Sequence, residues 1–268
     1  MEKRYEEQQV DHKISKAKPK IKDLITQAGG LLKSNLGKAE ALNTTSVDMK
    51  IDTDLIVEKF LIEGITNLFP DHNIYSEEQG NVDKESDFTW LIDPIDGSYH
   101  YLRGLPIFAI SLALKYKESF ILSYVLNPIL DELFWCSIQD GALLNNNPIK
   151  VSKTQNLQDI FLLIDFPNGT VNEDVFKFSF EILKKLVKRT YRVRVMGVSS
   201  LAMCYVAAGR ADAYISLSPR TRIYDKAAGM FIIEMANGIT TDISMQGNPL
   251  IVCSNKKIHN SLMEAIKV

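Results

Sequence analysis

The sequence predicts an α/β protein made of two lobes, an α+β lobe followed by an α/β lobe. Two helical patterns lead into a run of strand patterns, whereas helices and strands alternate in the second half. The length of 268 residues suits one large domain or two lobes. Turn residues gather near 145–155, so we divide the chain into a polar extension at 1–20, an α+β lobe at 21–147 and an α/β lobe at 148–268.

Apolar spacing defines the elements of the first lobe. Apolar residues recur at helical spacing over 21–36 and over 53–68, and Gly37 and Pro70 stop these two predicted helices. The last three strand patterns of this lobe alternate as in an antiparallel meander. The predicted strands stand at 73–76, 89–92, 108–116, 120–126 and 132–137.

The second lobe alternates between strands and helices. Its strand patterns stand at 161–166, 191–195, 211–217, 239–243 and 251–254. Its helical patterns stand at 174–188, 199–208 and 225–236, and a terminal helix begins near Lys257. Alternation of this kind builds a sheet with helices on its faces.

Composition and charge exclude several classes of protein. The net charge is −2, from 31 basic and 33 acidic residues, so the chain lacks the basic field that binds nucleic acid. The first 20 residues are too polar for a signal peptide, and no apolar run reaches the about 18 residues of a membrane span. Three scattered cysteines without a CxxC pair indicate reduced, buried thiols. We therefore expect a cytoplasmic protein without a membrane or nucleic-acid partner.

Four carboxylates carry the chemistry that the sequence indicates: Glu77, Asp93, Asp96 and Asp225. Three of them lie within 75–105, which opens with YSEEQG and ends with WLIDPIDGSYHYLRGL. Acidic side chains held this close repel one another unless a cation lies between them. Mg²⁺ prefers oxygen ligands of this kind. The sequence therefore indicates metal-assisted chemistry on an anion such as a phosphate.

The DPIDG sequence has a plainer interpretation, which its context weakens. Asp-Pro and Asp-Gly are common turn dipeptides. Here Asp93 ends an apolar strand, and open α/β sheets bind ligands at the carboxyl ends of their strands. Gly97 and Ser98 then open a short helix, whose free N–H groups favour an anion. The spacing does not fit an EF-hand, and the chain has no Walker A or GxGxxG sequence.

The second half offers a matching carboxylate in the sequence YDKAAG. Asp225 begins a predicted helix, where by itself it would be interpreted as an N-cap. The small residues at 227–229 let that helix pack closely on a neighbour, which would bring Asp225 toward Asp93 and Asp96. The sequence MGVSSLAM opens another helix, with Ser199 or the next serine able to cap it.

These motifs together resemble the inositol monophosphatase family of Mg²⁺-dependent, lithium-sensitive sugar phosphatases. The acidic pair of YSEEQG, DPIDG with a following hydroxyl, and D-x-A-A-G carry the resemblance, and FPDHNIYSEE, RGLPIFAISLAL and GRADAYI extend it over about residues 21–268. The resemblance implies a layered αβαβα sandwich that forms a homodimer. It also implies a hydrolase that uses two or three Mg²⁺ ions to cleave a small phosphorylated alcohol such as myo-inositol 1-phosphate.

The resemblance also implies the metal ligands. Glu77 and Asp93, with the carbonyl of Ile95, would hold one Mg²⁺. Asp93, Asp96 and Asp225 would hold a second. Two cations about 3.5–4 Å apart can activate a water and neutralise the leaving oxygen.

Further residues would act on the water and on the substrate. Glu77, assisted by Ser98, would orient and deprotonate the attacking water. Asp54 and Glu78 would support the shell of residues around the metal ions. Positioning and charge account for most of phosphoryl transfer, so no Ser/His or Cys/His nucleophile is needed. The residues that would contact the substrate are Asp96, Gly97, Ser98, Ser199, Arg220 and Asp225.

Several positions depart from the family pattern and leave the substrate open. Ser98 stands where the family usually has Thr, and Asn43 where a Lys is expected. Ser216 stands where animal enzymes place a Glu that bonds the inositol ring. The loop after it is longer and holds Arg220 and Arg222, which would favour a more anionic substrate unless they are solvated loop charges.

Two alternatives therefore stay open. The first is a phosphatase of a bisphosphorylated sugar or of a 3′-phosphoadenosine nucleotide. The second is a regulatory binding protein that keeps the fold, motivated by the basic N-terminal segment and by a cluster of cations, although such clusters are usually solvated and the complete carboxylate set argues against lost catalysis. The cluster consists of Lys184, Lys185, Lys188, Arg189, Arg192 and Arg194.

Overall fold

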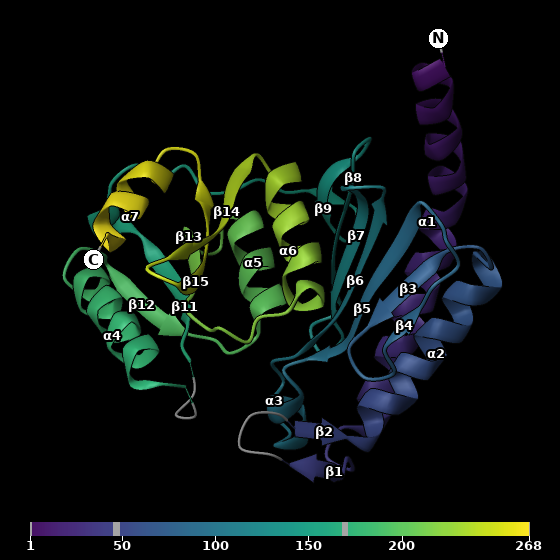
Figure 1. Ribbon diagram of the computed structural model, residues 1–268, viewed down its shortest axis with the longest axis horizontal. Helices are drawn as coiled ribbons and strands as arrows, with labels where there is room; N and C mark the ends of the chain where they lie inside the picture. Colours follow the sequence, from purple (N-terminus) through teal and green to yellow (C-terminus); the bar gives the residue numbers. More distant parts are fainter. Residues whose placement is uncertain (1, 45–48, 168–170, 268) are drawn as a thin grey trace.

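The computed structural model describes residues 2–44, 49–167 and 171–267, with side chains from residue 14 onward except at 43, 44, 49 and 50. Its helices and strands form five layers, in the order helix, sheet, helix, sheet, helix (Figure 1). This arrangement confirms the αβαβα sandwich and the mixed α/β class that the sequence predicts.

An eight-stranded sheet forms the second layer. β3 and β5 pair in parallel, and the other described pairs of this sheet are antiparallel. The predicted meander is confirmed in β6, β7 and β8. In spatial order the strands are β10 (Asn147–Pro148), β9 (Gly141–Leu144), β8 (Glu132–Ser137), β7 (Ser119–Asn127), β6 (Ala109–Tyr116), β5 (Phe88–Asp96), β3 (Asn73–Ser76) and β4 (Asn81–Val82).

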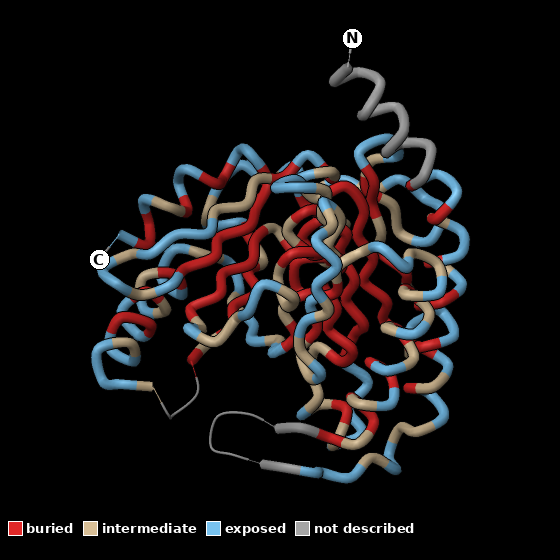
Figure 2. Tube along the Cα trace, turned by 45° about the vertical axis from the view of Figure 1, so that its right-hand side comes forward, coloured by how far each residue is buried: buried red, intermediate tan, exposed pale blue. Residues whose placement is uncertain are grey.

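Both faces of this sheet are apolar because helices cover both. Trp90 and Leu112 belong to the core shared with α1 (Glu2–Asn35) and α2 (Asp52–Leu68). Their neighbours Leu91 and Ala113 belong to the core shared with α5 (Ser199–Ala207) and α6 (Ile223–Met235). Successive residues of a strand point to opposite faces, so each strand contributes to both cores. Because helices cover both faces, the strands lie in the buried centre of the molecule (Figure 2).

A five-stranded sheet forms the fourth layer. One of its faces packs on α5, and the other packs on α4 (Glu173–Val187) and α7 (His259–Ile266). β11 is parallel to both of its neighbours, β12 and β13. In spatial order the strands are β12 (Arg192–Val195), β11 (Phe161–Asp165), β13 (Ala213–Ser216), β15 (Asn248–Asn255) and β14 (Gly238–Met245).

Helix α1 begins far before the predicted residue 21. Ile14 and Ala17 are buried, and Ile14 belongs to the same core as α2. Lys18 donates a hydrogen bond to Asp140, in the turn between β8 and β9. The packed part of the helix therefore starts inside the segment that we expected to be a polar extension. The division of the chain into 1–20, 21–147 and 148–268 stays a prediction.

Four short elements complete the described chain. β1 (Ala41–Thr44) and β2 (Met49–Ile51) form an antiparallel pair near α3 (Ser98–Leu102) (Figure 1). A single 3₁₀ turn, η1 (Leu157–Asp159), precedes β11. Asn43, which departs from the family pattern, lies in β1, and its side chain is outside the described residues.

Two expectations from composition can be compared with the structure. Cys136, Cys204 and Cys253 are buried and free, as predicted. In the described ranges, no helix combines the length and the apolar character of a membrane span.

Candidate active site

The carboxyl end of β5 bends and then turns sharply. Its pairing with β6 runs to Asp93, shifts register, and resumes at Asp96. A bulge of this kind bends a strand and changes where its side chains point. Gly97 follows with a φ of +97°, and a Cβ there would lie 2.8 Å from Val198 Cγ2. The turn that ends β5 therefore requires glycine, and α3 begins at the next residue.

The loop after β3 brings Glu77 to the same edge of the sheet. β3 runs parallel to β5 with Ser76 opposite Ile92, so the carboxyl ends of the two strands meet. The next residue, Glu78, donates from its backbone N–H to Glu58 Oε1 at 2.8 Å, which fixes the loop. Glu77 therefore lies beside the end of β5, close enough that its charge contributes to raising the pKa of Asp93.

Asp54 enters the site from the first turn of α2. Its Oδ2 accepts a hydrogen bond from the Ile51 N–H at 3.1 Å. Its Oδ1 accepts from Ser98 Oγ at 3.2 Å, and the same hydroxyl lies 2.9 Å from the carbonyl oxygen of Ile95. Ser98 therefore connects α2 to the turn that ends β5.

Asp225 comes from the third layer, in the first turn of α6. Its Oδ2 accepts from the Arg222 N–H at 2.6 Å, so α6 begins slightly earlier than predicted. The residues at 227–228 are buried, and a Cβ on Gly229 would lie 2.7 Å from Met203 Cβ. The small residues therefore let α6 pack closely on α5, as predicted.

These carboxylates lie close enough to change one another's ionisation. Burial, with the charges of Asp225 and Asp54, raises the pKa of Glu77 to about 9. Burial raises the pKa of Asp54 to about 8, and burial with Asp225 raises that of Asp96 to about 7. Burial raises the pKa of Asp93 as well, and Glu77 and Asp96 contribute. Ionised together, such groups need positive charge nearby.

The residues present fit a hard divalent cation in chemistry and charge. The donors are carboxylate and carbonyl oxygens, which Mg²⁺ prefers. Asp93 Oδ1 is buried and accepts no hydrogen bond from the described part of the chain. In their present orientations, however, no three His, Cys, Asp or Glu side chains of the described residues form a group able to hold a metal ion. Instead, one carboxylate oxygen of each of Asp54, Asp96 and Asp225 accepts a hydrogen bond from a backbone N–H.

The first turn of α5 lies against the same edge. The Ser200 N–H donates to Asp96 Oδ2 at 2.6 Å. Asp165, the last residue of β11, accepts from the Gly197 N–H at 2.9 Å and from Ser199 Oγ at 3.2 Å. The second sheet therefore supplies its own carboxylate beside the cluster.

The sequence analysis missed two buried acids here. Asp165 ends a predicted strand, so the rule that selected Asp93 applied to it as well. Glu58 lies one helical turn after Asp54, is fully buried, and its Oε2 has no hydrogen-bond partner among the described residues. Two acids at i and i+4 on a helix face that also carries apolar residues were the available signal for Glu58.

The predicted substrate contacts of the second lobe are less direct. Ser199 is partly exposed, and its hydroxyl donates to Asp165 Oδ2 at 3.2 Å. Arg220 is half-buried, and its backbone N–H donates to Ser218 Oγ at 3.3 Å. Ser216 is buried, with its hydroxyl 3.0 Å from that of Thr221. A contact between Arg220 and the substrate stays a prediction.

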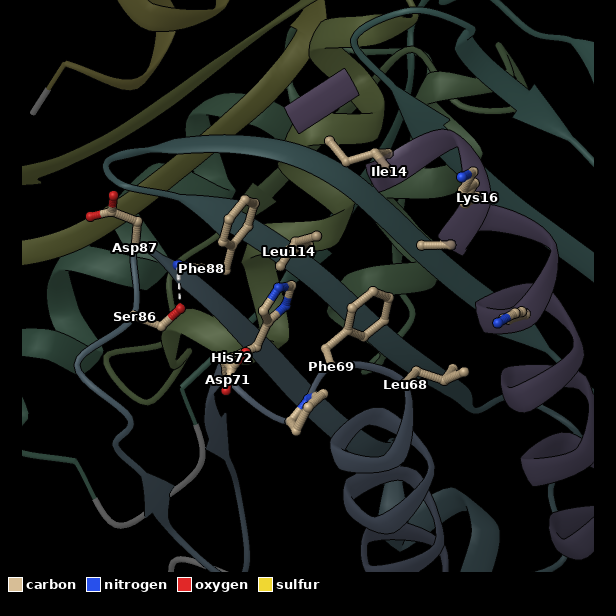
Figure 3. A pocket seen from close by; sticks show the side chains of 13 residues that line it. Ile14, Lys16, Leu68, Phe69, Asp71, His72, Ser86, Asp87, Phe88 and Leu114 are labelled. Carbon is tan, nitrogen blue, oxygen red and sulfur yellow. Dashed lines mark hydrogen bonds between the residues drawn. The ribbon is translucent and has the colours of Figure 1, made fainter. Parts of the chain in front are cut away.

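A cavity of about 530 Å³ lies away from these carboxylates (Figure 3). Ile14 and Lys16 of α1 line one side, and Phe69, His72 and Phe88 line another (Figure 3). Phe88 begins β5, whereas the carboxylates lie where β5 ends. The cavity is therefore separate from the candidate site.

Solved structures identify the class of fold. The extragenic suppressor protein suhB from Bartonella henselae has a TM-score of 0.85 and 25% identity, covering 94% of this chain and 98% of that one. An IMPase from Thermotoga maritima has a TM-score of 0.80 and 29% identity, covering 91% and 94%. The layered fold is therefore that of the inositol monophosphatases.

Sequence comparison identifies the family itself. Residues 12–267 match the inositol monophosphatase family, and the chain belongs to it. The "Nus factor SuhB" of Pasteurella multocida is 32% identical over 222 residues, 81% of this chain and 82% of that protein. The "Fructose-1,6-bisphosphatase/inositol-1-monophosphatase" of Thermotoga maritima is 30% identical over 249 residues, 91% and 93%. The resemblance inferred from the motifs is confirmed.

Proposed function

We propose that the protein is a Mg²⁺-dependent phosphomonoesterase that hydrolyses a small phosphorylated alcohol such as myo-inositol 1-phosphate. The observation that carries the proposal is the convergence of Glu77, Asp93, Asp96 and Asp225, from two strand ends and one helix, at one edge of the sheet. Membership of a family with relatives named as phosphatases supports the same reaction. The cytoplasmic location and the sensitivity to lithium are part of this proposal.

The chain's own oxygens would hold the cations. Glu77, Asp93 and the Ile95 carbonyl would hold one Mg²⁺, and Asp93, Asp96 and Asp225 a second. When bound, the two or three ions supply the positive charge that offsets the carboxylates, binds the phosphate and activates water. Asp93 Oδ1, which has no hydrogen-bond partner among the described residues, supports this assignment.

The remaining work of the site is positioning and proton transfer. Glu77 orients the attacking water and accepts its proton, assisted by the Ser98 hydroxyl. That hydroxyl is already held between Asp54 and the Ile95 carbonyl. The N–H groups of Gly97 and Ser98 contact the phosphate. Phosphoryl transfer requires little more from a protein.

A phosphate-release assay tests the proposal. With Mg²⁺ present, the wild-type protein should release phosphate from a member of a panel of inositol phosphates, sugar bisphosphates and nucleotide phosphates. Asp96→Asn keeps the size of the side chain but removes a charge, and should lose nearly all turnover. The matched control is Asp131→Asn, at an exposed carboxylate paired with Lys33, which should keep it. Full turnover by Asp96→Asn would contradict the proposal.

The substrate has a second candidate class, a bisphosphorylated sugar or a 3′-phosphoadenosine nucleotide. Arg220 and Arg222 favour a second anionic group, and the combined name of the Thermotoga maritima relative agrees with it. The same panel decides: a higher kcat/KM for bisphosphates that falls in Arg220→Gln would identify this class.

A regulatory function is a second candidate, because several relatives are named Nus factor SuhB. Part of the basic cluster is occupied within the chain: Lys184 lies 3.4 Å from Glu181, and the Arg192 guanidinium lies 4.7 Å from the centre of the Tyr191 ring. A pull-down with the full chain and with Lys188→Glu/Arg189→Glu tests it. Identical partners for both proteins would remove the motivation for this function, and phosphatase activity remains the leading proposal.

We also propose a homodimer. β12 is an edge strand of its sheet. Tyr191, just before the strand, is 61% exposed, and Val195, its last residue, is 64% exposed. An exposed edge with apolar neighbours pairs readily with another chain. Light scattering should give twice the chain mass of 30.3 kDa. Val195→Glu should give the mass of one chain, and a wild-type monomer would contradict the proposal.

A further inference from the structure

The cavity at the start of β5 takes no part in the proposed reaction (Figure 3). Its volume of about 530 Å³ falls within the range of roughly 300–1,000 Å³ that is usual for small-molecule sites. It lies between the first packed turns of α1 and the turn that joins α2 to β3. Ile14, Ala17 and Leu114, which belong to its lining, are buried. The cavity therefore has the size and the apolar surface of a site for a small organic molecule.

A row of stacked rings forms one wall of the cavity (Figure 3). The His72 ring lies between Phe69 and Phe88, with centroid distances of 4.7 and 4.5 Å and interplanar angles of 15° and 5°. The Trp90 indole N–H also donates to His72 Nδ1 at 3.1 Å. Because both faces of the His72 ring are covered, it lines the cavity with its edge, and the edge of an aromatic ring attracts negative charge. This wall is held in place by contacts within the protein and needs no ligand to form.

The wall formed by α1 carries two lysines, Lys16 and Lys20. They are four residues apart and therefore lie on one face of the helix. Lys18 and Lys22, on another face, donate to side chains in the turns on either side of β9. Within the described ranges, by contrast, the side chains of Lys16 and Lys20 form no ion pair or hydrogen bond. Two lysine charges therefore lie beside the cavity without a counter-charge from the described chain.

Two carboxylates also line the cavity, on the side away from α1 (Figure 3). Asp87 Oδ2 lies 3.8 Å from Lys117 Nζ, which offsets its charge. Asp71 is exposed, in the turn between α2 and β3. The row of rings lies between these acids and α1 (Figure 3). An anion is therefore favoured on the α1 side of the cavity, where the lysines are.

We propose that this cavity binds a small organic anion that has an apolar body. The anionic group lies beside Lys16 and Lys20, and the apolar body packs against Phe69, Phe88 and Leu114. Carboxylates, sulfonates and phosphates all supply such a group. Charges interact more strongly beside an apolar wall than in open water, so the lysines select an anion over a neutral molecule of the same shape. The inference goes beyond the proposed function and does not depend on it.

Two fluorescent probes test the charge requirement. Anilinonaphthalene sulfonate is an organic anion with an apolar body, and phenylnaphthylamine has the same rings without the sulfonate. Titrations in EDTA avoid any attraction of the sulfonate to cations in the carboxylate cluster. Lys16→Ser/Lys20→Ser should weaken binding of the sulfonate about threefold to tenfold, because two exposed charge contacts are lost. It should leave the affinity for the neutral probe unchanged.

Two further variants locate the binding site. The matched control is Lys22→Ser, on the same helix but bonded outside the cavity, which should change the affinity for neither probe. Ala17→Leu places a larger side chain in the cavity and should weaken both probes. Circular dichroism checks that this variant is folded, and the lysine variants decide the question if it is not. Octanoate should displace the sulfonate probe, whereas inorganic phosphate, which has no apolar body, should not.

The outcomes separate as follows. A loss of sulfonate affinity in Lys16→Ser/Lys20→Ser alone, with the neutral probe unaffected, supports the inference. An unchanged sulfonate affinity in that variant would show that the lysines do not bind the anion, and an equal loss in Lys22→Ser would show a general effect of surface charge. Binding of neither probe by the wild type would show that the cavity takes no such ligand. Each of these three results overturns the inference, and none of them bears on the phosphatase proposal.

Discussion

Two carboxylates at the ends of strands, Asp93 on β5 and Asp165 on β11, have opposite surroundings. Asp93 has carboxylates around it and a buried oxygen without a hydrogen-bond partner among the described residues. Asp165 has three donors on its two oxygens. Both positions follow the same topological rule, and the neighbours decide the role. A carboxylate among other carboxylates is suited to bind a cation, whereas a carboxylate among hydrogen-bond donors is suited to stabilise the local protein structure.

The largest difference should appear in catalysis. We expect Asp93→Asn to lower kcat more than about 100-fold, beyond the range known for groups that only support a metal ligand. Asp165→Asn should keep kcat within a few fold, since the Asp165 carboxylate accepts its hydrogen bonds from groups of the protein itself. Steady-state kinetics with saturating Mg²⁺ measure both. Similar losses of kcat in the two variants would remove the distinction between the two acids.

Metal binding should separate the two acids next. Mg²⁺ at about 100 times its Kd should stabilise the folded wild type by about 2.7 kcal/mol, which raises Tm by several degrees. Asp165→Asn should keep this rise, and Asp93→Asn should lose most of it. Thermal melts with Mg²⁺ and with EDTA measure the shift, and Na⁺ at equal ionic strength serves as the control. A full rise in Asp93→Asn would contradict its role as a ligand.

The acid cluster could be predicted from the sequence, whereas the Asp165 network could not. Asp93 and Asp96 follow an apolar strand and precede a glycine turn, so local sequence alone indicates a ligand edge. The network of Asp165 depends on the register of β11 with β13 and on the placement of α5, which bring Tyr214 and Ser199 together from distant sequence. Pairings of this kind leave no periodicity to read.

The start of α1 shows a different limit of sequence reasoning. Ile14 and Ala17 continue the helical spacing of Ile21, and the structure buries all three. The lysines at 13, 16, 18 and 20 favoured a polar extension in the sequence analysis. The Lys18 side chain instead donates a hydrogen bond to Asp140 in the turn between β8 and β9, so its charge helps to attach the helix to the sheet. Charge density at the ends of a chain is therefore weaker evidence than apolar spacing.

Substitutions of Asp165 and Asp93 should change stability in EDTA in opposite directions. Asp165→Ala leaves the Gly197 N–H and the Tyr214 hydroxyl without their acceptor, at an expected cost of about 1–3 kcal/mol in the free energy of unfolding. Asp93→Asn removes one charge from a repelling group, and its amide can donate to neighbouring carboxylates, so the free energy of unfolding in EDTA should rise. Urea unfolding measured by circular dichroism tests both signs. A loss of stability in Asp93→Asn without metal would show that repulsion does not dominate there.

The smallest expected effect concerns His259, which begins α7 and contacts two strands of the five-stranded sheet. Its ring nitrogens lie 2.8 Å from Thr241 Oγ1 and 2.8 Å from Ser254 Oγ. Burial lowers its pKa below the usual 6.5, so the folded state favours the neutral ring. The unfolded state then binds more protons as pH falls, and stability is present above pH 6.5 and lost below it. His259→Gln keeps the bonds to both hydroxyls without titrating, so Tm of the wild type should fall more steeply than that of the variant between pH 7 and pH 5. Parallel curves would mean that His259 does not contribute to the pH dependence of stability.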